Sequence, residues 1–64
     1  MNIESGSYKH LKSGSIYNVL NEKTVINATN KDDGQLMVLY KNKEGILFVR
    51  DVNEFLEKFI KVYL

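Results

Sequence analysis

The sequence predicts a mainly β domain that ends in one helix, with four to five antiparallel strands over about residues 7–50 and the helix over about residues 52–63. Three observations predict this fold class. Short apolar runs alternate with glycine-containing turns, and the hydrophobic spacing changes from strand-like to helical after residue 51. The chain has 64 residues, of which 44% are hydrophobic, so it can enclose one core. We therefore expect residues 1–64 to form a single domain.

Turn signals divide the first fifty residues. Glycine accepts positive φ, and neighbouring Ser or Asp side chains bond the local backbone. The turn signals are Ser5-Gly6-Ser7, Ser13-Gly14-Ser15, Asp32-Asp33-Gly34 and Glu44-Gly45. Asp32 and Asp33 also present two carboxylates, but adjacent acids before a glycine are typical of a turn rather than of a metal site.

The runs between these turns have strand character. They are residues 15–21, 24–29, 36–40 and 46–50. The first run alternates, with Tyr17 and Val19 on one face, the second is rich in β-branched residues, and the last two are continuous apolar runs. Asp33-Gly34 and residues 41–45 suit hairpin connections, which predicts that the last three strands form a meander.

Helical spacing begins after residue 51. Apolar residues recur three and four positions apart in one broad stripe formed by Val52, Phe55, Leu56, Phe59, Ile60 and Tyr63. Asp51 stands at the N-cap position, and Glu54 completes a capping-box pattern. Glu54 with Lys58 and Glu57 with Lys61 are favourable i, i+4 pairs. Because so short a helix is marginal alone, we expect it to pack on the sheet and close one end of a small SH3-like barrel.

The composition excludes several classes of protein and of site. The chain has no Cys and one His, which leaves no disulfide framework and no thiolate site, and we expect neither a metal nor a cofactor. No uncharged apolar run approaches the roughly 20 residues of a membrane span. The polar N-terminal segment with Glu4 is unlike a signal peptide. We therefore expect a cytoplasmic protein without a membrane partner.

Size and charge also bear on partners. The formal charge of +1 argues against a strongly electrostatic nucleic-acid binder. A domain this short has a thin stability margin, and natural domains of this size often gain stability from a partner subunit. Since Val62 and Leu64 lie beside the main helical stripe, we predict a homodimer or a higher homo-oligomer.

Several sequence blocks resemble one family. They are Tyr8-Lys9-His10 with Gly14 and Tyr17-Asn18-Val19, then Val38-Leu39-Tyr40, Leu47-Phe48-Val49-Arg50-Asp51 and Asn53-Glu54-Phe55-Leu56-Glu57. They resemble the Tyr-Arg-His…Gly…Tyr-x-Val, Val-Val-Tyr, Leu-Trp-Val-Arg-Pro and Glu-Met-Phe-Leu-Glu blocks of the short prokaryotic and phage family known as domain of unknown function 1653. Phe48 and Asp51 stand where that family has Trp and Pro. The resemblance implies a compact β-rich domain without an established activity.

His10 and Arg50 are each the only residue of their type in the sequence. His10 is the only His and titrates near neutrality, which suits either a ligand donor or a backbone hydrogen bond. Arg50 is the only Arg, and its rigid fork matches a carboxylate or a phosphate. Its alternative role is an internal ion pair with Asp51, Asp32 or Glu54. Because the first and last strands of a small barrel are commonly neighbours, we expect both cations to converge on one anion.

Four tyrosines exceed what a minimal core needs. Tyrosine suits interfaces because it combines apolar area with one hydroxyl, and its alternative place is the half-buried wall of the barrel. Tyr8 and Tyr40 match positions of the family, and Lys9 lies between Tyr8 and His10 in the first block. The predicted ligand-binding residues are Tyr8, Lys9, His10, Tyr40 and Arg50.

These observations predict a small non-enzymatic binding module, because one His without Cys or a metal cluster offers few means of building a catalytic site. The first hypothesis is that the module binds or sequesters an anionic, nucleotide-like ligand at a boundary between two copies. The composition, rich in Lys, Asn and Ile, indicates an AT-rich source, which extends this hypothesis to a phage or mobile-element protein with an anti-defence role. The alternative is an SH3-like protein- or nucleic-acid-interaction module.

Overall fold

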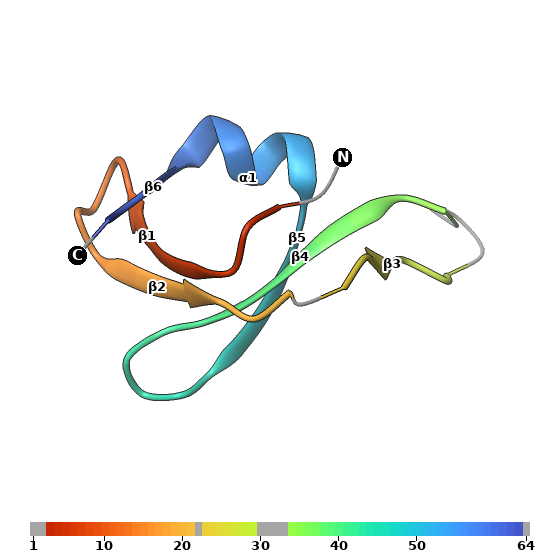
Figure 1. Cartoon of the computed structure of the whole chain (residues 1–64), viewed down its shortest axis with the longest axis horizontal. Helices are drawn as coiled ribbons and strands as arrows, with labels where there is room; N and C mark the ends of the chain where they lie inside the picture. The colour runs from red at the N-terminus through yellow and green to blue at the C-terminus, as the bar shows by residue number, and fades with distance from the viewer. Residues whose placement is uncertain (1–2, 22, 30–33, 64) are drawn as a thin grey trace.

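The computed structural model describes residues 3–21, 23–29 and 34–63, which form six β-strands and one helix (Figure 1). The elements are β1 Gly6–His10, β2 Ile16–Val19, β3 Val25–Ile26, β4 Leu36–Lys41, β5 Leu47–Asp51, α1 Val52–Lys58 and β6 Phe59–Lys61. The predicted class, mainly β with one helix near the C-terminus, is confirmed. Gly6 opens β1 with a φ of +119° instead of lying in a turn.

All strand pairs are antiparallel and belong to one sheet. β1 lies between β2 and β6, and β4 pairs with β5 along one edge and with β2 and β3 along the other. The predicted meander is confirmed as β3–β4–β5, whereas the predicted turn residues Asp32 and Asp33 lie outside the described residues. β3, β5 and β6 each pair with one strand only and are the edge strands of the sheet. No ladder joins them within residues 3–21, 23–29 and 34–63, so closure into a barrel stays a prediction.

One side chain joins the two strands that share an edge of β4. β2 pairs with the C-terminal end of β4 and β3 with its N-terminal end, which leaves a gap between them. The backbone N–H of Leu20 donates to the carbonyl of Leu39 at 2.8 Å. The side-chain amide of Asn21 accepts from the N–H of Leu39 at 2.6 Å and donates to the carbonyl of Met37 at 3.0 Å. Asn21 thereby continues the hydrogen bonding of β4 across the gap.

The helix is shorter than the sequence predicts. The N-cap is confirmed, since a carboxylate oxygen of Asp51 accepts from the N–H of Glu54, but α1 ends at Lys58 rather than near residue 63. Phe59 has extended angles (φ −130°, ψ 152°), and residues 59–61 pair with β1. The edge of β1 offers residues 59–61 backbone hydrogen-bond partners, which favours a strand over a longer helix. A buried Phe59 beside an exposed Ile60 fits the alternation of a strand as well as the spacing of a helix.

The two i, i+4 pairs expected on that longer helix are also corrected. Glu54 forms its ion pair with Arg50, which precedes the helix, rather than with Lys58. Lys61 lies in β6, with its ammonium 5.6 Å from the ring centroid of Tyr8, and so does not face Glu57 from one helical turn away.

The core lies between α1 and the face of the sheet that α1 covers (Figure 1). Its buried members are Tyr8, Val19, Val38, Tyr40, Val52, Phe55 and Phe59. Alternation along the strands sends Lys9, Ile16, Asn18 and Lys41 to the outer face of the sheet. The tip of the β4–β5 hairpin projects away from α1, beyond the last residues that pair β2 with β4.

Candidate functional site

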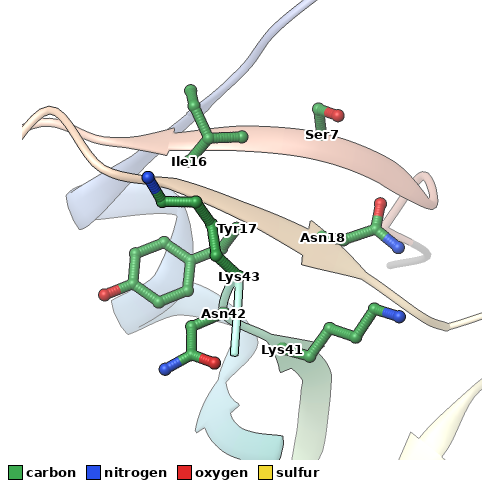
Figure 2. A pocket seen from close by; sticks show the side chains of 7 residues that line it. All are labelled: Ser7, Ile16, Tyr17, Asn18, Lys41, Asn42 and Lys43. Carbon is green, nitrogen blue, oxygen red and sulfur yellow. The ribbon is translucent and has the colours of Figure 1, made fainter. Parts of the chain in front are cut away.

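An open pocket of about 310 Å³ lies between β2 and the tip of the β4–β5 hairpin (Figure 2). It is lined by Ser7, Ile16, Tyr17, Asn18, Lys41, Asn42 and Lys43. The pocket forms because β2 and β4 pair at only two positions, the last of which joins Asn18 to Lys41. Beyond Lys41 the chain enters the hairpin turn, so the turn and the start of β2 separate and leave a hollow between them.

Two lysines give this pocket its charge. Lys41 and Lys43 both line it, no acidic residue does, and neither lysine forms a salt bridge with a described residue. In Figure 2 the ammonium of Lys43 extends toward Ile16, while the side chain of Lys41 runs below Asn18. Asn18 and Asn42 add amide groups and Ser7 a hydroxyl. Such a set of cations and neutral donors suits an anionic ligand.

Tyr17 connects the pocket to the aromatic core. Its ring centroid lies 5.4 Å from that of Phe59, 5.6 Å from that of Tyr40 and 6.2 Å from that of Phe48, each in an edge-on arrangement. These neighbours hold the ring in place. The Tyr17 hydroxyl has no hydrogen-bond partner within the part of the chain that the structure describes. A half-buried, fixed ring beside two cations can contact the apolar or aromatic part of an anionic ligand.

Three of the five residues predicted from the sequence lie around one ring. The centroid of Phe59 is 4.9 Å from that of His10, 5.4 Å from that of Tyr40 and 5.9 Å from Cζ of Arg50. His10 and Arg50 therefore both lie beside the buried ring of Phe59, and their convergence on one anion stays a prediction.

His10 and Arg50 both have internal partners. Nδ1 of His10 accepts from the N–H of Ser13 at 3.2 Å and lies 3.0 Å from the Ser13 hydroxyl oxygen. Arg50 donates from Nε to the Tyr40 hydroxyl at 3.2 Å and from Nη1 to Glu54 at 2.6 Å. The hydrogen bond to Tyr40, with a further contribution from Glu54, raises the pKa of Arg50. The ion pair with Glu54 is one of the internal roles that the sequence offers for Arg50.

The other two predicted residues lie apart from this group. Tyr8 is buried beside Phe55, with its ring centroid 5.2 Å from that of Phe55, and its hydroxyl donates to the carbonyl of Glu4 at 2.8 Å. Burial, followed by the charge of Glu4, raises the pKa of Tyr8. Lys9 lies on the outer face of the sheet, where it pairs with Ile16 and Ile60.

None of the five residues predicted from the sequence lines this pocket. Asn18, Lys41, Asn42 and Lys43 come together only through the register of β2 against β4 and through the hairpin turn. The one signal in the sequence is a polar, lysine-flanked stretch from Lys41 to Lys43 directly after an apolar strand.

Among the described residues, no group of three or more His, Asp or Glu could hold a metal ion, and no helix is long and apolar enough to cross a membrane. Comparison with known proteins gives no match to a family model, to a curated protein or to a solved structure. The resemblance to domain of unknown function 1653 therefore stays a hypothesis carried by its sequence blocks.

Proposed function

We propose that this protein is a non-enzymatic binding module that holds an anionic, nucleotide-like ligand in the pocket between β2 and the β4–β5 hairpin. The observation that carries the proposal is the lining of that pocket, where Lys41 and Lys43 lie with Tyr17 and no acidic side chain takes part. The two ammonium groups bind the phosphate groups, and the ring of Tyr17 contacts the base.

The chemistry of each group supports this assignment. A lysine ammonium is a compact point charge that binds phosphate without the fixed geometry of a guanidinium. The amides of Asn18 and Asn42 suit the hydroxyl and carbonyl groups of a ribose or a base. A volume of about 310 Å³ is at the small end for ligand pockets. We therefore expect a mononucleotide, bound in the micromolar to millimolar range because the pocket is open.

The same lining supports a binding role over a catalytic one. The pocket-lining residues include neither an imidazole nor a carboxylate, which are the usual partners in general acid–base chemistry. The resemblance to a prokaryotic and phage family extends the proposal to a phage or mobile-element protein. In that setting the module removes a nucleotide signal by holding it.

Calorimetric titration with ATP, AMP, adenosine and inorganic phosphate tests the proposal. We expect ATP to bind more tightly than AMP and adenosine to bind weakest, because adenosine lacks the phosphate groups. Added salt should weaken ATP binding, since Lys43 is exposed and Lys41 is partly exposed to solvent. Replacing both by Lys41→Ala and Lys43→Ala should weaken ATP binding by about tenfold or more, which is about 1.4 kcal/mol.

The matched control changes two exposed lysines outside the pocket, Lys12→Ala with Lys23→Ala. This pair alters the net charge equally, so it should leave ATP binding nearly unchanged. Equal losses in both double variants would mean that binding follows overall charge and not the pocket. Affinity for single-stranded oligonucleotides that rises with length beyond one nucleotide would instead support the nucleic-acid alternative.

A further inference from the structure

β5 is an edge strand with an exposed apolar run. Leu47, Phe48 and Val49 are consecutive and are 60%, 37% and 61% exposed, and Ile46 before them is 55% exposed. β5 pairs with β4 on one side, and no described residue pairs with its other side. Proteins usually protect such edges with charged residues, proline or very short strands, because a free edge pairs with other strands. Residues 46–49 contain none of these protections, and the charged residues of β5, Arg50 and Asp51, stand only at its C-terminal end.

The hairpin bonding identifies which backbone groups face the free side of β5. The N–H of Asn42 donates to the carbonyl of Ile46 at 3.1 Å, so these two residues form a hydrogen-bonded pair. Bonded and non-bonded pairs alternate along an antiparallel ladder. Phe48 is therefore bonded to β4, whereas the N–H and C=O groups of Leu47 and Val49 point away from β4.

The other edge strands, β3 and β6, lack these features. β3 has only two residues, which is the very short kind of edge. β6 has three residues, and of these Phe59 is buried and Lys61 is charged. Only Ile60 is both apolar and exposed there. A short edge with a lysine is the protected kind, so strand pairing between molecules is favoured at β5.

We propose that two copies of this protein pair β5 with β5, antiparallel, about a twofold axis at Phe48. In this register Leu47 of each copy lies opposite Val49 of the other, and their outward backbone groups form four hydrogen bonds between the copies. The two sheets become one continuous sheet. The contact is isologous and closes at two copies. It is independent of the proposed ligand, because the pocket lies on the β2 side of β4.

The apolar run itself favours a second copy as the occupant. In the proposed register Leu47 lies opposite Val49 of the second copy, and Phe48 lies opposite Phe48, so each exposed apolar side chain of β5 meets an apolar one. The twofold axis repeats these pairs, and the contact uses neither Lys41 nor Lys43 of the pocket. A foreign strand would have to supply the same apolar pattern.

Sedimentation over a range of micromolar concentrations tests the association. The wild-type protein should sediment as a dimer, and Val49→Lys, which places a charge on an exposed position of β5, should sediment as a monomer. Two matched controls introduce the same charge elsewhere: Leu56→Lys on α1 and Ile60→Lys on β6, at positions 45% and 54% exposed. Both should remain dimeric. A monomeric wild type, or a dimer lost in Ile60→Lys and retained in Val49→Lys, would overturn the proposal.

Single introduced cysteines test the register. The chain has no cysteine of its own, so any disulfide must join the introduced residues. In the proposed dimer the two copies of residue 48 are a directly opposed, non-bonded pair, whose Cα separation of about 4.5 Å permits a disulfide. Phe48→Cys should therefore form a covalent dimer on mild oxidation, and Leu56→Cys should not. Faster crosslinking of Leu47→Cys than of Phe48→Cys would place the twofold axis elsewhere and contradict the register.

Discussion

The rings of Phe55 and Phe59 lie face to face, with centroids 4.1 Å apart and planes 4° from parallel. Phe55 belongs to α1 and Phe59 opens β6, so this contact spans the point where the helix ends. Both side chains are buried, and the N–H of Phe59 donates to the carbonyl of Phe55. The stacked pair thus fixes the direction in which the chain leaves the helix and enters the sheet.

Phe55→Ala should remove much of the stability of the domain. Phe55 is fully buried and contacts the rings of Tyr8 and Tyr40 as well as that of Phe59. Loss of such a side chain costs about 3–5 kcal/mol, and small domains have little more than this in total. Chemical denaturation measures the change. The neighbouring exposed variant Leu56→Ala should change the free energy of unfolding by about 0.5 kcal/mol or less, and equal midpoints for the two variants would refute the packing described for α1.

Asn21→Ala should destabilise the sheet although it removes few atoms. The variant leaves the N–H of Leu39 and the carbonyl of Met37 without their partner between β2 and β3. A buried polar group left unpaired costs about 1–3 kcal/mol. Thermal unfolding compares this variant with Asn53→Ala, an exposed change on α1 where alanine favours the helix. If Asn21→Ala melts no lower than Asn53→Ala, the side chain does not connect the two strands.

The stability of the protein should fall in acid through Asp51. The N–H of Glu54 and then the side chain of Gln35 hold the pKa of Asp51 below the ordinary value for Asp. A carboxyl group with a lowered folded-state pKa stabilises the fold above its unfolded pKa of about 3.9 and loses that contribution as pH falls through the folded-state value. Thermal midpoints of wild type and Asp51→Asn, which keeps a capping oxygen, should therefore converge as pH drops below about 4. Parallel curves would show that Asp51 carries no such contribution.

Arg50→Lys distinguishes the two candidate sites. The sequence-based hypothesis predicts that this variant keeps the fold and binds an anionic ligand less tightly, because the guanidinium fork is lost. The internal bonds of Arg50 to Tyr40 and Glu54 predict a different result. We expect a loss of about 1 kcal/mol or less in stability, since the ion pair is partly exposed, and unchanged binding of ATP in the pocket. Weaker ATP binding by Arg50→Lys would instead indicate that the ligand binds at Arg50 and His10.

Local sequence signals were sufficient for much of the fold. The N-cap at Asp51, the meander of the last strands and the break in spacing after residue 51 depend on short-range chemistry that the sequence displays. The end of the helix depends instead on β1, some fifty residues earlier in the chain, because Phe59 and Ile60 can alternate along a strand or share a helical stripe. A periodic pattern cannot show that a distant strand has a free edge.

The site was less predictable than the fold for the same reason. The sequence drew attention to single residues such as His10 and Arg50, which have internal partners in the folded protein. The pocket arises from common residues, Lys41 and Lys43 among them, where two strands separate. Their proximity follows from strand register, which is a property of the assembled sheet.

An amide-resolved NMR titration with ATP tests whether the pocket binds the nucleotide, because it locates the ligand on the protein residue by residue. We expect saturable shifts centred on Tyr17, Asn18 and residues 41–43, with little change on addition of adenosine. Shifts centred on His10 and Arg50, or no saturable shifts at any residue, would contradict the assignment of the pocket between β2 and the β4–β5 hairpin as the binding site.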